Sequence, residues 1–395
     1  MVISKKILPI IVVSQFFCTS LWFASNGVMT NLVVNFNLNN NVLGLLTSAV
    51  QFGFIAGTLL FALLCIVDRF SPSKVFFFSA IFGAFFNVAM VYNHQSLFSL
   101  LTLRFFTGFF LAGIYPVGMK IATDYYEKGL GKSLGFLVGA LVIGTALPHL
   151  LKDILVDYSW KSVLIATSIL AGFGGLMMLL FVKNGPYRKA NKTLNLSVCF
   201  TVFKNVNFRK AAFGYFGHMW ELYTFWAFVP ILLSIYEKMH DHISFNIPLL
   251  SFLIIGIGGF SCVLSGYTSE KLGVKKTAFY FLLLSCFCCF ISPFIFEISN
   301  EYLFISFLIF WGMVVIADSP LFSTLIAQNA PKQDKGTALT IVNCVGFSIT
   351  IISILVLNYI QTKTTSNIIF MILAFGPILG LIALKTKTPD KQEFL

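Results

Sequence analysis

Long apolar segments separated by short polar loops run along the whole 395-residue chain. At the start of the chain, no Asp, Glu, Lys, Arg or His occurs between Lys6 and Asp68, a stretch that contains two such segments. A run of about 20 apolar residues is long enough to cross a bilayer as an α-helix. The pattern predicts twelve transmembrane helices, at residues 7–32, 43–67, 75–92, 97–121, 131–151, 161–182, 213–236, 247–268, 277–297, 302–327, 336–360 and 367–384.

Composition favours a membrane protein over a soluble one. Hydrophobic residues make up 57% of the chain and charged residues 11%, whereas a soluble domain carries about 25% charged residues. The basic start of the chain and the apolar run after it also resemble a signal peptide. That run has no small-residue cleavage site followed by a polar domain, so we interpret it as a retained first helix. We therefore expect an all-α polytopic membrane protein.

Basic residues are distributed unevenly among the predicted loops. With the N-terminus in the cytoplasm, 22 Lys and Arg residues fall on the cytoplasmic side, four on the outer side and one, Arg104, inside a span. The positive-inside rule therefore predicts that both termini are cytoplasmic. The net charge of +12 follows from this bias, and attraction to anionic lipid head groups explains it without a nucleic-acid partner.

One charged loop occurs twice, at matching points of the two halves of the chain. Its acidic residues, Asp68 and Glu270, lie 202 positions apart, and each copy separates two long apolar segments. Such a repeat predicts a transporter built from two parallel halves. We expect a six-helix bundle over residues 1–182, a cytoplasmic linker over 183–212 and a second six-helix bundle over 213–395.

These loops resemble the G-x-x-x-D/E-R/K-x-G-x-R/K-R/K motif of the major facilitator superfamily (MFS). The second copy has Gly266, Glu270, Lys271, Gly273, Lys275 and Lys276, and the first keeps Asp68, Arg69 and Lys74 but has Leu64 and Ser71 in place of glycine. The resemblance implies two six-helix bundles that carry a solute by alternating access. It also implies a gating role, in which the loops pair with the opposite half in the outward-open state, for Asp68, Arg69, Gly266, Glu270, Lys271, Gly273 and Lys275. The alternative is a topology signal alone.

Three shorter stretches extend the resemblance. Helix 4 contains Arg104 and Gly108, similar to an R-x-x-x-G motif of the family, and helix 5 is rich in glycine, as is typical of antiporters. Residues 217–223 of helix 7, Gly-His-Met-Trp-Glu-Leu-Tyr, look like one bacterial branch of the family. That branch implies a multi-pass protein of the bacterial cytoplasmic (inner) membrane, without indicating its substrate.

Ionisable groups deep in a membrane are costly, so each one is a functional candidate. Only two acids, Glu221 and Asp318, lie well inside predicted spans. His218 shares a helix face with Glu221, because the two are one turn apart. We predict that these three groups couple transport to protons, and the alternative is a set of structural hydrogen bonds. Pro320 also predicts a break of the helix beside Asp318.

Further candidates concern the substrate. Arg104 is the only Arg buried in a span, so it can bind an anionic substrate or make a structural contact within the first bundle. Lys120, near the inner end of helix 4, is expected to extend to the lipid head groups. Helices 1, 4, 7 and 10 line the cavity in this family, although aromatic side chains also pack between helices. The remaining candidates for substrate contact are Trp22, Asn26, Tyr115, Trp220, Tyr223 and Asn343, with Trp226 as an additional aromatic residue.

Metal, cofactor and enzyme motifs are not recognisable in the sequence. The cysteines Cys286, Cys288 and Cys289 form a cluster with one C-x-x-C spacing, but we interpret them as buried apolar thiols, because they lie inside a predicted span. The spacing of His218 and Glu221 alone does not supply the ligands of a metal site. Without a G-x-x-x-x-G-K-[ST] loop, an ATP-driven machine is not expected. We predict no cofactor and no bound metal.

The leading interpretation is a monomeric secondary transporter of a small molecule, most simply a proton-coupled symporter of an organic anion. Arg104 opposite Glu221 and Asp318 favours that reaction. The aromatic lining and glycine-rich helix 5 favour the alternative, a proton-driven exporter of an amphipathic compound, drug or siderophore. A transporter-like receptor without flux is the alternative outside transport. The expected partners are the substrate, the proton and the lipid bilayer.

Overall fold

The computed structural model describes residues 6–39, 41–126, 130–188, 201–331, 335–364 and 366–385, and for 130–132 it describes the backbone alone. The first half contains α1 (Ile7–Thr19), α2 (Ala24–Gly27), α3 (Met29–Asn35), α4 (Val42–Leu63), α5 (Ile66–Arg69), α6 (Pro72–Ala89), α7 (Leu97–Leu111), α8 (Tyr115–Tyr125), α9 (Leu130–Ile154) and α10 (Lys161–Phe181). The second half contains α12 (Val206–Met239), α13 (Ile247–Gly256), α14 (Gly258–Leu272), α15 (Val274–Phe296), α16 (Glu301–Ala317), α17 (Ser319–Asn329), α18 (Lys335–Gln361), the 3-10 helix η1 (Asn367–Ala374) and α19 (Phe375–Lys385).

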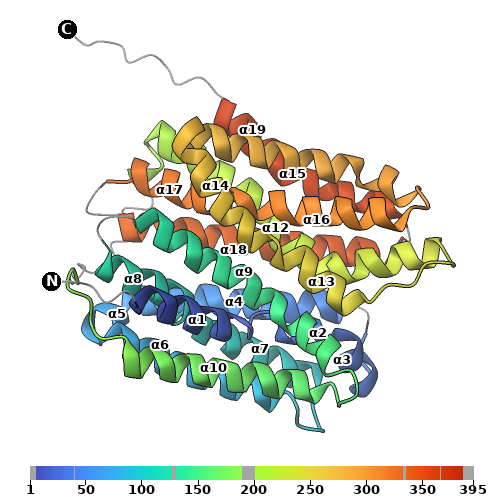
Figure 1. The fold of residues 1–395 in the computed structure, drawn as a ribbon, viewed down its shortest axis with the longest axis horizontal. Coiled ribbons are helices and arrows are strands. Elements are labelled where there is room, and N and C mark those ends of the chain that lie inside the picture. The colour runs from blue at the N-terminus through green and yellow to red at the C-terminus, as the bar shows by residue number, and fades with distance from the viewer. Residues whose placement is uncertain are drawn as a thin grey trace.

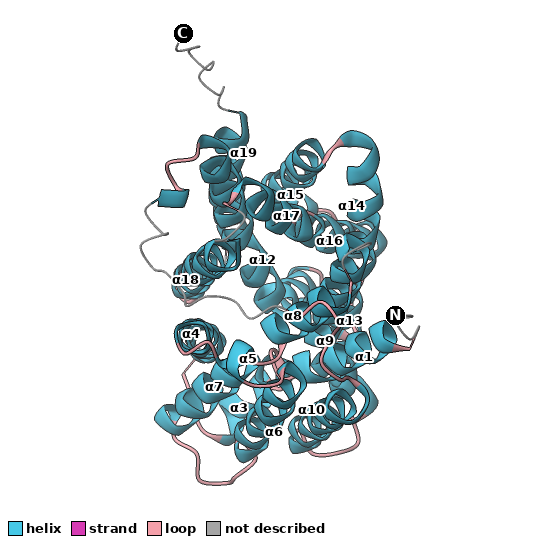
Figure 2. Ribbon diagram, turned by 90° about the vertical axis from the view of Figure 1, so that its left-hand side faces the viewer, coloured by secondary structure: helices cyan, strands magenta, loops and turns pink. Residues whose placement is uncertain are grey.

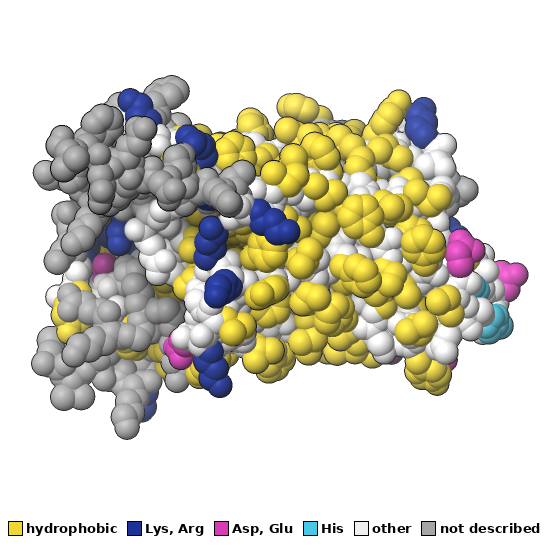
Figure 3. Space-filling view, turned by 90° about the horizontal axis from the view of Figure 1, so that it is seen from above, with side chains coloured by type: hydrophobic (Ala, Val, Ile, Leu, Met, Phe, Trp, Pro, Cys, Tyr) yellow, Lys and Arg dark blue, Asp and Glu magenta, His cyan; other side chains and the backbone are white. Residues whose placement is uncertain are grey.

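These helices make twelve crossings of the molecule, as the hydropathy pattern predicts. Eleven helical segments are long and apolar enough to cross a membrane, and α1 is a shorter apolar helix that α2 and α3 extend. A bilayer offers the backbone no hydrogen-bond partners, so a spanning chain satisfies its amide groups within helices. Large apolar side chains cover much of the outer surface, and Figure 3 shows them as a broad belt with charged side chains near both of its margins.

Several crossings consist of two helical segments instead of one. The continuous first helix predicted over 7–32 is wrong, because the chain leaves the α-helix between Thr19 and Ala24. The break predicted at Asp318 is present, since α16 ends immediately before it and Pro320 lies in the first turn of α17. A proline in the first turn costs no helical hydrogen bond. These breaks place polar groups of the backbone inside the protein, where they need partners.

The seventh crossing begins earlier than its hydropathy indicates. Helix α12 begins at Val206, where the Asn205 side chain accepts hydrogen bonds from two backbone N–H groups and caps the helix. The predicted start was residue 213, because Arg209 and Lys210 lower the local hydropathy. A capped helix can continue beyond the apolar part of its sequence.

The two halves of the chain form two bundles that lie side by side (Figure 1). Helix α4 of the first half packs against α18 of the second, and α9 packs against α13 and α14 (Figure 2). We call the end where α1 begins and α19 ends the inner end, after the predicted cytoplasmic orientation, and the opposite end the outer end.

Small residues allow the halves to approach closely where α9 meets α14. A Cβ atom added to Gly139 would lie 3.1 Å from the carbonyl oxygen of Gly259, and one added to Gly259 would lie 3.1 Å from that of Gly139. Helices whose interfaces contain glycine can bring their backbones together in this way. The glycine-rich character of helix 5 therefore has a packing role at the boundary between the halves.

Polar contacts join the two halves at the outer end. The Asn358 amide, near the end of α18, donates to the carbonyl oxygen of Asn41 at 3.4 Å. The Asn246 amide, before α13, donates to the Asp153 carboxylate at 2.5 Å. The structure therefore has its two halves in contact at the outer end.

Candidate functional site

Six aromatic side chains from both halves form a buried group, the aromatic cluster, on the inner side of these contacts: Trp22, Phe23, Phe54, Tyr223, Trp226 and Phe347. Trp22 lies in the break between α1 and α2, and its ring is 5.8 Å from Tyr223 of α12 and 5.7 Å from Phe347 of α18. The indole N–H groups of Trp22 and Trp226 have no hydrogen-bond partner among the described residues. Two predicted substrate-contact residues, Trp22 and Tyr223, thus meet across the interface.

Tyr223 of the aromatic cluster also belongs to a group of three tyrosines that lie close enough to interact electrostatically, with Tyr215 of the same helix and Tyr115 of α8. We call them the tyrosine triad. Tyr115 belongs to the first half and the other two to the second, so the triad also crosses the interface. Their hydroxyl groups make no hydrogen bond within the described residues. Each hydroxyl is thus available to donate to, and accept from, a polar solute.

Sequence reasoning missed Tyr215, although a signal for it was present. Tyr215 precedes His218 by three residues on α12, so the two side chains share a face of that helix. Their rings are 6.0 Å apart. The three-residue spacing that places His218 and Glu221 on one helix face therefore also selects Tyr215.

A buried histidine–aspartate pair lies next to the triad. His218 Nδ1 is 2.8 Å from Asp318 Oδ1, and each side chain is only 1% exposed. Asp318 occupies the break between α16 and α17, where an acid interacts favourably with the N-terminal dipole of α17. His218 Nε2 and Asp318 Oδ2 have no hydrogen-bond partner in the described part of the chain. Two of the three predicted proton-coupling residues are therefore in direct contact.

The third predicted proton-coupling residue, Glu221, has different neighbours. Its Oε1 atom accepts hydrogen bonds from the Ser285 hydroxyl at 2.5 Å, the Trp311 indole N–H at 2.7 Å and the Cys289 thiol at 3.2 Å. These donors lie on α15 and α16, so Glu221 points into the second bundle. This is the hydrogen-bonded arrangement that the sequence allowed as its structural alternative.

Arg104 makes the contact within the first bundle that the sequence also allowed. Its guanidinium donates to the carbonyl oxygen of Leu21 at 3.0 Å and to that of Trp22, both in the break after α1. A longer bond of 3.5 Å reaches the Asn87 side chain. The side chain is fully buried. Arg104 therefore compensates for helical hydrogen bonds lost at the break and fixes the backbone that carries Trp22.

The other predicted substrate-contact residues occupy three different surroundings. The Asn26 amide donates to the Thr47 hydroxyl at 3.0 Å and joins α2 to α4. Trp220 faces the last crossing, where its indole N–H donates to the Ile372 carbonyl oxygen at 3.0 Å. Asn343, on α18, is half-buried and makes no hydrogen bond within the described residues. Of these three, only Asn343 has polar atoms free for a solute.

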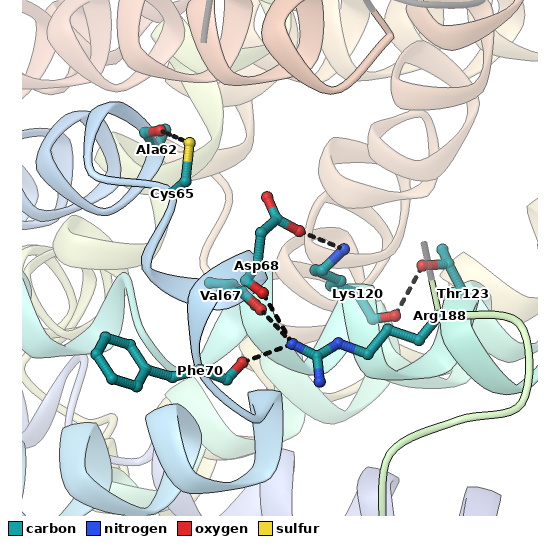
Figure 4. Close-up of polar contacts among 8 residues, drawn as sticks. All are labelled: Ala62, Cys65, Val67, Asp68, Phe70, Lys120, Thr123 and Arg188. Atoms are coloured by element: carbon teal, nitrogen blue, oxygen red, sulfur yellow. Dashed lines mark hydrogen bonds and ion pairs between the residues drawn. The ribbon is translucent and has the colours of Figure 1, made fainter. Parts of the chain in front are cut away.

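The first charged loop makes its contacts with its own half and with the start of the linker. Asp68 pairs with Lys120 of α8 at 3.2 Å, and the Arg188 guanidinium donates to the carbonyl oxygens of Asp68 and Phe70 (Figure 4). Lys120 was expected to extend to the head groups, but it is turned toward Asp68 instead. Both groups are mostly shielded from solvent, and the lower local dielectric strengthens their attraction.

The two copies of the loop differ in where the backbone turns. In the second, Gly273 has φ +86°, a value that favours glycine. In the first, Ser71 has φ −63°, and the left-handed residue is instead Cys65, with φ +51°. The first copy therefore tolerates serine because its turn has moved upstream.

The second loop is exposed at the inner end. Glu270, Lys271 and Lys275 are all exposed, and Gly266 has open space where a Cβ atom would lie. Arg69 likewise lies exposed at the end of α5. None of these side chains pairs with the opposite half within the described residues. The gating contacts predicted for an outward-open state are thus not made in this arrangement, in which the outer end is the end in contact.

The titratable side chains form no metal-binding group in the described part of the chain. Seven cysteines in that part are free thiols, and the cluster of Cys286, Cys288 and Cys289 is buried on α15. Cys286 and Cys288 pack as small apolar side chains, whereas the Cys289 thiol also donates to Glu221. Cys199 lies outside the described residues.

Comparison with solved structures supports the fold. The nucleoside transporter NupG matches with a TM-score of 0.73 and 14% identity, over 96% of this chain and 98% of that chain. The proton:xylose symporter XylE matches with 0.74 and 12%, over 95% and 94%. A bacterial homologue of the human lysosomal transporter Spinster, in an inward-facing and unoccupied conformation, matches with 0.68 and 13%, over 96% and 94%. A search of curated proteins found no match.

The family model of the Major Facilitator Superfamily matches residues 11–354. This match covers most of the chain and confirms the resemblance that the charged loops indicated. It also confirms the predicted twelve-helix fold and the expectation of a carrier, whereas the bacterial branch stays a prediction. The chain therefore belongs to the Major Facilitator Superfamily and is a multi-pass membrane transporter.

Proposed function

We propose that this protein is a proton-coupled secondary transporter in which the His218–Asp318 pair carries the proton and the tyrosine triad contacts the solute. The observation that supports this proposal is the position of the pair, which lies beside Tyr215 at the junction of the two bundles. A group that loads a proton must be able to influence the solute site. Glu221 is directed away from that junction and into its own bundle.

The pair provides a simple means of coupling. When one proton is shared between the imidazole and the carboxylate, the pair has no net charge. Loss of that proton leaves an uncompensated negative charge in a buried position, which costs several kcal/mol. Alternating access allows the proton to arrive from one side of the membrane and leave toward the other. The change in charge then favours one arrangement of α16 and α17, at whose break Asp318 lies.

The geometry favours an uncharged polar or ring-containing solute. The organic-anion interpretation depended on Arg104, but this guanidinium is occupied by backbone carbonyl groups and is fully buried. The triad supplies hydroxyl groups and the adjacent aromatic cluster supplies flat apolar faces. Such a combination suits a solute with hydroxyl or carbonyl groups on a ring, which can stack and hydrogen-bond at once.

A second candidate is export of an amphipathic compound. An apolar groove of about 470 Å³ runs along α4 and α7, and Ile351 of α18 contributes to it. Its lining includes Phe52 and Phe105, so it can hold an apolar part of a compound taken from the bilayer. Proton-driven efflux of a lipophilic dye, lost when Phe52 is replaced by Asn, would favour this candidate over uptake of a polar solute.

The contacts at the outer end support an inward-facing arrangement as the state described. We propose that the charged loops act in the other state, where Asp68 and Glu270 exchange their present surroundings for contacts with the opposite half. Asp68 would then release Lys120. This use of the loops follows the gating role implied by the family motif.

The proposal is tested with the full chain reconstituted in liposomes. Uptake of a panel of radiolabelled sugars, nucleosides and carboxylates is measured with and without an inward proton gradient. For any solute accumulated by wild type, we expect Asp318→Asn to abolish accumulation while counterflow exchange continues, because the neutral amide fixes the uncharged form. Normal uphill accumulation by that variant would contradict the proton-carrying role.

A further inference from the structure

A second cavity lies at the inner end of the second bundle, away from the tyrosine triad. It has a volume of about 220 Å³ and lies between the start of α12, the start of α15 and the ends of α17 and α19. Its polar lining comes from Lys210, Lys275, Asn207 and Asn329, and Leu325 and Leu384 supply apolar walls. The transport mechanism proposed above uses none of these residues.

Lys210 is the unusual member of this lining. Its side chain is only 6% exposed, and its Nζ atom reaches the cavity, because it is not among the buried polar atoms that lack a partner. Within the described residues it has neither an ion-pair partner nor a hydrogen bond. The carbonyl ends of α17 and α19 reach the same cavity, but Lys210 donates to none of the described carbonyl groups. Its charge is therefore uncompensated by this part of the protein.

The surroundings of Lys210 increase the local positive charge. Lys275 and Arg209 both lie close enough to repel it electrostatically. Lys275 and Lys276 belong to the first turn of α15, where the helix dipole also disfavours positive charge. Two lysines line this cavity and no acid faces it in the described residues, so the local charge favours a bound anion.

The position of the cavity indicates what kind of anion it meets. Basic side chains gather where the apolar belt ends near the inner end of the molecule, on the face formed by α14, α15 and α19 (Figure 3). Phosphate groups occur at this depth in lipid head groups and also in the aqueous phase beside the membrane. Lysine ammonium groups and asparagine amides are suitable donors to phosphate oxygens.

We propose that the cavity lined by Lys210 and Lys275 binds a phosphate group at the inner surface of the membrane. Lys210 supplies the charge from inside the cavity, and Lys275 closes the site from its rim. The side-chain amides of Asn207 and Asn329 can donate to the remaining phosphate oxygens. Occupancy neutralises the repulsion between the two lysines and holds the inner ends of α12 and α15 together.

The test compares Lys210→Gln and Lys275→Gln with Lys276→Gln in the full chain. Lys276 is the matched control, because it is exposed on the same turn of α15 but does not line the cavity. Thermal unfolding is measured in a neutral detergent, with sodium phosphate against sodium chloride of equal ionic strength. A second arm counts bound lipid by native mass spectrometry after reconstitution with phosphatidylglycerol or phosphatidylcholine.

We expect the phosphate group to stabilise wild type and Lys276→Gln, and each cavity variant to weaken its binding about tenfold or more. Stabilisation by inorganic phosphate identifies a soluble ligand, and retention of phosphatidylglycerol alone identifies a lipid head group. Lys275 is exposed, so its variant keeps the test valid if Lys210→Gln does not fold. No binding in either arm, or an equal loss in Lys276→Gln, would overturn the proposal.

Discussion

At the scale of single residues, the two acids buried in spans have different surroundings. Asp318 pairs with His218 and keeps one carboxylate oxygen without a partner. Glu221 has three donors directed at a single oxygen, Oε1. A proton that binds Glu221 would therefore go to Oε2. Sequence alone treats these acids as equivalent, because both are single charges in apolar helices, and only their neighbours distinguish them.

Glu221 provides a prediction about stability. In Glu221→Gln the amide oxygen can still accept from Ser285 and Trp311, so we expect folding and proton-driven accumulation to be kept. In Glu221→Leu these donors lose their acceptor, which costs about 1–3 kcal/mol for each buried group left unpaired. Thermal unfolding and uptake of both variants check this. Loss of accumulation by Glu221→Gln with normal folding would transfer the proton-carrying role from Asp318 to Glu221.

At the scale of elements, the breaks within helices decide where functional groups lie. The break after α1 turns two carbonyl groups toward Arg104 and directs Trp22 toward the second half. The break at Asp318 brings an acid to His218. The proline beside Asp318 predicted the second break. The first contains neither proline nor glycine between Thr19 and Ala24, and the buried guanidinium that compensates for it comes from a residue 82 positions after Trp22.

The contact between α9 and α14 gives a prediction with an internal control. Gly139→Leu places a side chain against the backbone of Gly259, so we expect the halves to separate and the outer-end contacts to weaken. A Cβ atom added to Gly135, one turn earlier on α9, meets nothing within 4 Å, so we expect Gly135→Leu to behave as wild type. Hydrogen–deuterium exchange at the start of α13 reports opening of the outer end. Equal exchange in both variants would contradict the assigned role of this contact.

At the scale of the whole molecule, polar side chains join the two halves at the outer end. The outer end is joined by side chains from both bundles, whereas the charged loops at the inner end bond within their own half or to the start of the linker, or lie exposed. In an alternating-access carrier, contacts at one end must break before the solute can leave toward that side. The outer-end contacts are thus the ones that a cross-link should make permanent.

A pair of engineered disulfides tests this consequence. Asp153 Oδ1 and Asn246 Nδ2 are 2.5 Å apart, so cysteines at these two positions would connect the two halves at the outer end. We expect oxidation to stop transport in liposomes and a reducing agent to restore it. Cysteines at Ser71 and Asn184 form the control and should leave transport active, because the hydrogen bond of 2.8 Å between Ser71 Oγ and Asn184 Oδ1 joins the first half to the start of the linker and does not connect the two halves. Continued transport by the oxidised Asp153–Asn246 variant would show that the halves need not separate there.

Much of the architecture follows from the sequence, because lipid imposes a simple rule on it. The number of long apolar segments gives the number of crossings, and the repeated charged loop marks the two halves. Both features can be read without knowing how the helices pack. The site was only partly predictable. Tyr115, His218, Tyr223 and Asp318 were found as polar or aromatic residues in apolar helices, but the same criterion also selected Trp220, which contacts the last crossing. Which way a helix faces is settled by all its neighbours together.

The sequence by itself thus determined the class of protein, its twelve helices and a short set of residues able to carry chemistry. The tertiary structure alone decided which of those residues meet. It joined His218 to Asp318, directed Glu221 into its own bundle and assigned Arg104 to the carbonyl groups of a broken helix. The physical reason is that hydropathy reports the free energy of a residue in lipid, whereas hydrogen bonds and ion pairs depend on partners distant in the chain.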